Sequence, residues 1–363
     1  MKNPSSFIFF FVFIACFNAN AQKRFNHSAS IGWQTHYGSY LSQSPKADYI
    51  KDSYTFFNEL YYQQQTSGSK EWQQVNNGPQ WGVAFFWGGT GSKKYMGHMM
   101  GAYPFATIPL YKTNRFASKL RGGMGLGWVQ HPYDKATNHK NVLIGRHLNG
   151  YIGFLWQNEL RIFQRLYASA GFSFTHLSNG GSTLPNLGLN VPAVTFGLRY
   201  GAPEVAVTKT FKKPFDKRGL QYRAWLGAGI KQAPWIESKR YGVKTLAGEV
   251  SKQLGYSSAV SGGAVLYHDK SLEVHPLGIP SLKRKGTYLQ AGVYAAYEHH
   301  LGKLSIPLQL GTYVWNKDKN PQLFQNIGMR YKMGAQWNVQ VLLKTHMGQA
   351  DHLQAGIGYR FKQ

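Results

Sequence analysis

The sequence predicts an all-β protein, a transmembrane antiparallel β-barrel of roughly 12 to 14 strands. Three observations favour this fold class. The chain opens with a segment typical of secreted proteins, most of the remainder alternates apolar with small or polar residues, and the last alternating segment ends on an aromatic residue, Phe361. A soluble β-sandwich also alternates, so the export signal and the small or charged residues on the second face decide between the two classes.

The N-terminus has the features of a secretory signal peptide. Lys2 is followed by an apolar run from Phe7 to Phe17, and small residues at Ala19 and Ala21 precede Gln22. We expect cleavage after Ala21, which makes residues 1–21 the signal and 22–363 a single outer-membrane barrel domain. The apolar run is too short to cross a bilayer as a helix.

Composition excludes several kinds of chemistry. The single cysteine, Cys16, lies within the signal, so the mature chain forms no disulfide and offers no thiolate for catalysis or metal binding. A lipoprotein signal with Cys16 acylated is the lesser alternative, because Phe13 stands where leucine is usual. The formal charge of +26 could suggest nucleic acid, but export argues against it. In an outer membrane, phosphate-bearing glycolipid is the natural anionic partner, although the cations could equally solvate loops and a pore lining.

The alternation is clearest at the C-terminal end of the chain. Gln354, Gly356, Gly358 and Arg360 separate a row of apolar residues, namely Leu353, Ala355, Ile357, Tyr359 and Phe361. The least regular segments are Gln43 to Pro79, Val207 to Arg218 and Glu237 to Gly255, which we interpret as long loops or short extra elements. No linker is evident, so one continuous barrel is expected.

The stretch from Phe163 to Tyr200 is the most informative part of the chain. It is predicted to form a strand, a loop and a returning strand, each with period-two alternation. His176 and Ser178 continue the apolar row of the first strand, and Asn190 falls on the apolar row of the second. If the apolar face meets lipid, these three polar side chains face the membrane rather than a water-filled interior.

These residue types are suited to ester hydrolysis. Serine is a weak nucleophile until a base takes its proton, and histidine can do so near neutral pH. Residues i and i+2 of a strand share a face about 7 Å apart, so inclined side chains of His176 and Ser178 can meet. Asn190 on the neighbouring strand would orient the imidazole. The Asn179 side chain and the Gly181 amide are candidate donors to an oxyanion.

The loop resembles two families of outer-membrane esterases. Lipid A 3-O-deacylases of the PagL type carry H-x-S-N, then P-N-x-G, then Glu fourteen positions after the His. This pattern is matched by His176, Ser178, Asn179, Pro185, Asn186 and Gly188. Asn190 occupies the Glu position and is the one departure from that pattern, so a slower or differently tuned enzyme is expected. Outer-membrane phospholipases A carry H-x-S-N-G, here completed by Gly180, and an Asn at the same spacing as Asn190. The P-N-x-G segment favours the deacylases and their longer relatives, the acyloxyacyl hydrolases.

The resemblance implies a serine esterase in the outer membrane of a Gram-negative bacterium, acting on an ester-linked acyl chain of lipid A in lipopolysaccharide. The alternatives are an outer-membrane phospholipase A and a noncatalytic barrel or channel. No cofactor or metal is expected for a deacylase, whereas calcium is implied if the protein is like the phospholipases. No nucleic-acid partner is expected, and the sequence leaves the oligomeric state open.

Other polar residues give weaker signals. Lys344, His346, Asp351 and His352 cluster near the last turn but lack the spacing of metal ligands, so we interpret them as polar loop residues. Glu159 is interpreted as a solvated acid at a turn.

Overall fold

The computed structural model describes residues 28–42, 45–203, 219–233, 239–274, 286–317 and 321–361. The predicted signal peptide, residues 1–21, lies outside this described part. Strands dominate the fold, with one short helix, α1 (Glu71–Val75), and 3₁₀ helices at Pro45–Ile50 and Lys270–Glu273. None of the helices described is long and apolar enough to cross a membrane.

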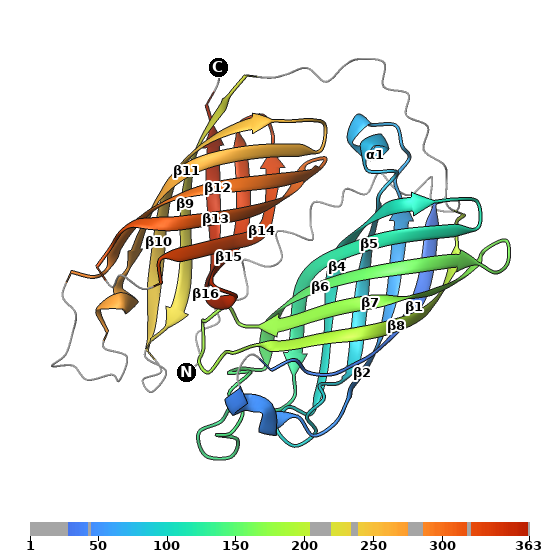
Figure 1. Cartoon of the computed structure of the whole chain (residues 1–363), viewed down its shortest axis with the longest axis horizontal. Helices are drawn as coiled ribbons and strands as arrows, with labels where there is room; N and C mark the ends of the chain where they lie inside the picture. The colour runs from blue at the N-terminus through green and yellow to red at the C-terminus, as the bar shows by residue number, and fades with distance from the viewer. Residues whose placement is uncertain are drawn as a thin grey trace.

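The first eight strands form a closed antiparallel barrel (Figure 1). Each strand pairs with the next along the chain, and β1 pairs with β8 to close the sheet, with Ile31 opposite Tyr200. The strands, in chain order, are β1 (Ala29–Gly38), β2 (Thr55–Gln65), β3 (Gln80–Gly89), β4 (His98–Lys112), β5 (Phe116–Val129), β6 (Leu148–Arg161), β7 (Leu166–Ser178) and β8 (Leu189–Gly201).

The remaining eight strands form a second closed barrel. Here β9 pairs with both β10 and β16, so this sheet also closes on itself. Its strands are β9 (Gln221–Gln232), β10 (Arg240–Gln253), β11 (Ser258–Asp269), β12 (Leu289–Leu301), β13 (Leu304–Asn316), β14 (Leu323–Met333), β15 (Trp337–His346) and β16 (Gln349–Arg360).

The all-β antiparallel barrel class is confirmed, but the expectation of one barrel with 12 to 14 strands over residues 22–363 is wrong. The structure has two barrels of eight strands each. Period-two alternation specifies which side chains face inward. The alternation is the same whether the strands form one large barrel or two small ones. The point of closure depends on β8 returning to pair with β1, and no local pattern specifies that pairing.

Two of the segments interpreted as long loops or short extra elements contain full strands. The range from Gln43 to Pro79 contains β2, and the range from Glu237 to Gly255 contains β10. Both strands direct a carboxylate into a barrel, Glu59 from β2 and Glu249 from β10, with no more than 2% of either residue exposed. Polar residues occur on both faces of β2 and β10, so the apolar–polar alternation is weak in their sequences. The third range, Val207 to Arg218, lies outside the described residues.

The interior of the first barrel is filled with aromatic rings and ion pairs, as expected for a narrow eight-stranded barrel. Arg121 donates to Glu59 at 2.7 Å, and Tyr103 donates to the same carboxylate. Glu159 pairs with Arg199 at 2.6 Å and also with Lys119. The interpretation of Glu159 as a solvated turn acid is therefore wrong, since only 1% of it is exposed.

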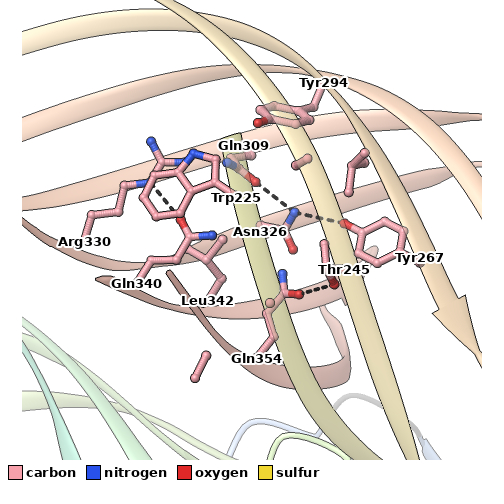
Figure 2. Close-up of a pocket in the computed structure, with 15 residues that line it drawn as sticks. Trp225, Thr245, Tyr267, Tyr294, Gln309, Asn326, Arg330, Gln340, Leu342 and Gln354 are labelled. Atoms are coloured by element: carbon pink, nitrogen blue, oxygen red, sulfur yellow. Dashed lines mark hydrogen bonds between the residues drawn. The ribbon is translucent and has the colours of Figure 1, made fainter. Parts of the chain in front are cut away.

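The second barrel is also filled. Figure 2 shows the middle of its interior, where Asn326 donates to Gln309 at 2.9 Å and Thr245 donates to Gln354 at 2.7 Å. The cavity between these side chains measures about 20 Å³, which is room for about one water molecule. Arg330 nearby pairs with Glu249 and Glu298 at 2.8 and 2.9 Å.

Polar residues near the last turn belong to this interior as well. Lys344 and His352 are 1% and 0% exposed, and Asp351 contacts Lys344 at 3.3 Å and Lys231 at 2.7 Å. Their interpretation as polar loop residues is wrong. Alternation places Lys344 and His352 on the inward rows of β15 and β16, where carboxylates compensate the buried cation.

Among the described residues, the two barrels contact each other at two places. At one end, α1 of the first barrel reaches the second, where Asn76 donates to Ser257 at 2.8 Å and contacts His299 at 3.1 Å. At the other end, the loop between β7 and β8 meets the ends of β9 and β16 (Figure 1). That loop follows directly on His176 and Ser178.

Candidate functional site

Two neighbouring strands bring His176, Ser178 and Asn190 together. His176 and Ser178 close strand β7, Asn190 opens β8, and the pairing of these strands sets His176 directly opposite Asn190. A hairpin with a ten-residue loop thus converts a spacing of fourteen residues into direct contact. The sequence pattern already predicted this placement.

The three side chains form a hydrogen-bonded chain. The Nδ1 atom of His176 lies 2.6 Å from Oδ1 of Asn190, and its Nε2 atom lies 2.9 Å from Oγ of Ser178. An amide oxygen only accepts hydrogen bonds, so Nδ1 carries the proton in the neutral ring. Nε2 is then the acceptor, and the Ser178 hydroxyl donates to it. This is the tautomer in which histidine can remove the serine proton.

The chain of three lies on the outward face of the first barrel, as strand parity predicted. Phe172 and Phe174 precede His176 in the same row and are 59% and 37% exposed. Thr175 and Leu177, which alternate with them, point inward and are at most 1% exposed. Ser178 and Asn190 are themselves only 7% and 4% exposed, because the following loop covers them.

Asn179 holds the shape of that loop. Its side-chain Nδ2 donates to the Thr183 carbonyl at 2.8 Å, and its Oδ1 accepts from the Thr183 amide at 3.1 Å. Its own backbone amide donates to Oδ1 of Asn186 at 3.0 Å. The predicted oxyanion donor therefore has one amide hydrogen committed inside the loop. Asn186, which the sequence singled out only as a motif residue, thus stabilises the loop by accepting this hydrogen bond.

Gly180 and Gly181 lie in the loop directly after His176 and Ser178. Both have left-handed backbone angles, φ of +61° and +77°. A Cβ on Gly180 would lie 3.0 Å from the Cβ of Leu353, and one on Gly181 would strike the Asp351 carbonyl oxygen. Among the described residues no acceptor for the Gly181 amide is found, so this predicted oxyanion donor keeps its hydrogen available.

The Pro185–Gly188 part of the motif fits against the imidazole. Gly188 has φ of +80°, and a Cβ there would lie 2.7 Å from Cε1 of His176. The Gly188 amide donates to the Leu143 carbonyl at 3.0 Å, which ties this segment to the β5–β6 loop. Pro185 also meets that loop, since its carbonyl oxygen would lie 2.6 Å from a Cβ on Gly145. The glycine thus lets the loop pass close to the histidine ring.

Sequence reasoning missed the contribution of the second barrel. The backbone amide of Gln232 donates to the Gly181 carbonyl at 2.9 Å, and Oε1 of its side chain accepts from the Leu184 backbone amide at 3.1 Å. Arg240 donates to the Ser182 carbonyl at 3.0 Å. Nothing in the local sequence around Gln232 or Arg240 marks them, because both are ordinary polar residues at strand ends.

The fold is a β-barrel, and this constellation on its wall is of the kind that can hydrolyse a carboxylic ester. Two family models match the chain in tandem and together cover more than three quarters of it. Residues 58–199 match the lipid A 3-O-deacylase (PagL) family, and residues 220–363 match the acyloxyacyl hydrolase C-terminal domain. The chain belongs to this lipid A 3-O-deacylase family. The boundary between the two matches falls between the two barrels.

No curated protein matches the chain. Among solved structures, Neisserial surface protein A is 8% identical with a TM-score of 0.34, over 47% of this chain and 96% of its own. A Rhodopseudomonas blastica porin mutant is 7% identical with a TM-score of 0.19, over 92% and 99%. Omp33 of Acinetobacter baumannii is 8% identical with a TM-score of 0.18, over 93% and 98%. These similarities add nothing to the fold that strand pairing defines.

Proposed function

We propose that the protein is an outer-membrane serine esterase that removes an ester-linked fatty acyl chain from lipid A of lipopolysaccharide. The observation that carries this proposal is the hydrogen-bonded chain from Asn190 through His176 to Ser178 on the outward wall of the first barrel. Membership of the lipid A 3-O-deacylase family supports the choice of substrate.

Ser178 is the nucleophile in this mechanism and His176 is the base. As Oγ of Ser178 attacks the ester carbonyl carbon, its proton passes to Nε2 of His176. Asn190 accepts from Nδ1 throughout and keeps the ring in place. When the tetrahedral intermediate collapses, His176 returns the proton to the departing sugar oxygen. A water molecule then hydrolyses the acyl-serine ester by the same steps, which releases the fatty acid and restores Ser178.

The developing oxyanion needs donors that are already in place. The Gly181 backbone amide is our first candidate because it has no acceptor among the described residues. Asn179 is the second, through the amide hydrogen that it does not give to Thr183. The bonds that hold Asn179 inside the loop would also keep that hydrogen in a fixed direction.

The outward position of the site suits a substrate that stays in the membrane. The outward rows of β7 and β8 expose Phe172, Val194 and Phe196 on the wall that leads along these strands to the site, with Phe196 62% exposed. An acyl chain could reach Ser178 laterally without being transferred into water, which would cost about 0.8 kcal/mol per methylene. The signal peptide predicted at residues 1–21 supports export, and the apolar outward rows support insertion into the outer membrane.

The Asn at position 190 supports a slower enzyme than a carboxylate would give. An amide oxygen fixes the tautomer of His176, but it stabilises the imidazolium formed in the transition state less than a negative charge does. The three residues require no metal for this chemistry, so we propose activity without a cofactor.

Asn190 is also the observation that favours a second candidate, phospholipase A. The Asn occurs in that family at the same spacing and would orient the histidine in the same way. Purified protein given phospholipid with and without calcium separates the two. Fatty-acid release that requires calcium and occurs from phospholipid but not from lipid A would favour the phospholipase.

Mass spectrometry of lipid A tests the leading proposal. Cells that express the native protein should contain lipid A lacking one acyl chain, and cells that express Ser178→Ala should retain it. Equal amounts of both proteins in the outer-membrane fraction are the control. Identical acylation patterns in the two strains would contradict the proposal.

A further inference from the structure

The end of the second barrel is built against the loop that carries the candidate oxyanion donor. Gln232 ends β9 and holds the loop at two points. Its backbone amide donates to the Gly181 carbonyl, and its side-chain Oε1 accepts from the Leu184 backbone amide. Arg240 begins β10, the strand paired with β9, and adds bonds to the Ser182 carbonyl and to Oγ1 of Thr183 at 3.0 and 3.2 Å. Four consecutive loop residues therefore depend on a different barrel.

Packing reinforces these hydrogen bonds. Leu343 lies on the outward row of β15, yet it is only 8% exposed, whereas Leu353 and Ile357 in the outward row of β16 are 45% and 46% exposed. Its Cδ1 atom would lie 3.7 Å from a Cβ on Gly180, so the catalytic loop is what covers it. The second barrel thus packs Leu343 and Leu353 against Gly180 and the Asp351 backbone against Gly181.

The loop has little else to fix it on this side. Bonds from Asn179 and Asn186 hold its interior, and the Gly188 amide ties its far end to Leu143. The Gly181 carbonyl, however, is fixed only by the backbone amide of Gln232 among the described residues, and the Gln232 and Arg240 side chains hold the next three residues. Rotation of the two glycines would turn the Gly181 amide away from the oxyanion, because glycine backbone angles are little restricted by sterics.

We propose that the second barrel is part of the active site, with Gln232 and Arg240 as positioning residues that hold the Gly180–Gly181 turn in the orientation needed for the transition state. They act through the loop and do not touch the reacting atoms. This inference rests on the proposed esterase function. It gives a function to the second barrel, whose described residues form no His-Ser hydrogen bond of their own.

A double variant tests the inference. Gln232→Ala/Arg240→Ala removes the side-chain bonds to Leu184, Ser182 and Thr183 and leaves the backbone bond from Gln232 to Gly181 in place. Because the loop can then pivot about that one remaining bond, we expect kcat on lipid A in mixed micelles to fall about 10- to 100-fold, while KM changes less than about threefold. The substrate is still bound by the outward face of the first barrel, so only the stabilisation of the transition state should decrease. Gln232→Glu in an otherwise native chain keeps the acceptor Oε1 and should retain activity within about threefold.

The matched control is Lys252→Ala/Gln253→Ala, which removes the same kinds of side chain at the opposite end of β10. It should leave kcat and KM unchanged. Heat-modifiable migration on gels reports the folded barrel in each variant. Unchanged kcat in the Gln232/Arg240 variant would overturn the inference, as would a fall in activity that merely follows loss of the folded form. Full activity of Ser178→Ala would instead overturn the proposed esterase function itself, so the two failures are distinguishable.

Discussion

The two barrels share a design inside and differ outside. Each closes eight antiparallel strands around aromatic rings and buried ion pairs, such as Glu159 with Arg199 in the first and Glu249 with Arg330 in the second. The first barrel alone, within the described residues, carries a His-Ser-Asn chain on its wall. The proposed chemistry therefore lies on one hairpin of the first barrel, and we assign the second barrel only the task of positioning its loop.

The largest expected effect comes from removing the histidine of that chain. His176→Ala should lower kcat by about 10⁴-fold or more, because Ser178 then has no base. The control is His268→Ala, a half-buried histidine at the corresponding end of the second barrel, which should leave kcat unchanged. Steady-state hydrolysis of lipid A measures both. Comparable losses in the two variants would remove the functional distinction between the barrels.

The similarity of the interiors is tested by stability. Glu159→Ala leaves Lys119 and Arg199 buried without their carboxylate, and we expect the free energy of unfolding of the first barrel to fall by about 3 to 5 kcal/mol. Glu249→Ala/Glu298→Ala should cost the second barrel at least a comparable amount, since it leaves Arg330 and Arg223 without the two carboxylates that they share. Urea unfolding in lipid vesicles measures both changes. A loss below about 1 kcal/mol in either variant would show that the two interiors are not equivalent.

A smaller effect should distinguish two glycines with the same kind of backbone. Gly188→Ala should lower kcat about tenfold or more, because its Cβ would press on Cε1 of His176 at 2.7 Å. Gly334 of the second barrel has φ of +71°, and a Cβ added there would meet no atom within 4 Å. Gly334→Ala should cost only about 1 kcal/mol of backbone strain and leave kcat unchanged. Equal kcat values for the two variants would argue against close packing around His176.

The smallest effect concerns the residue that orients the histidine. Asn190→Glu should raise kcat several-fold, about 1 kcal/mol, because a carboxylate stabilises the imidazolium of the transition state better than an amide does. Asn190→Gln has nearly the same size without the charge and serves as the control. A decrease with Glu no smaller than the decrease with Gln would show that this site is built for a neutral partner.

The sequence predicted the β-barrel class and the side of the wall on which the proposed catalytic residues lie, because alternation is a local property. His176, Ser178 and Asn190 were placed correctly since strand parity and hairpin pairing are enough to bring them together. The division into two barrels could not be predicted in the same way. It depends on pairing of β1 with β8, which are far apart in the chain, and on polar residues such as Glu59 that interrupt the alternation of β2.

The residues of the site that the sequence did not predict also depend on contacts between distant parts of the chain. Gln232 and Leu343 contact the catalytic loop only because a second barrel docks there, and no spacing within the first barrel refers to them. Asn179 was predicted from the motif as an oxyanion donor, and the structure adds its bonds to Thr183. Local patterns thus predicted which residues meet across one hairpin, but not which residues meet between barrels.

The central claim is that Ser178, activated by His176 on the outward wall of the first barrel, is the nucleophile. Reaction of the purified protein with a lipophilic fluorophosphonate, followed by peptide mass spectrometry, tests it most directly. The account predicts one labelled site, at Ser178, and loss of labelling in His176→Ala but not in His268→Ala. Labelling at another serine, or unchanged labelling of Ser178 without His176, would contradict it.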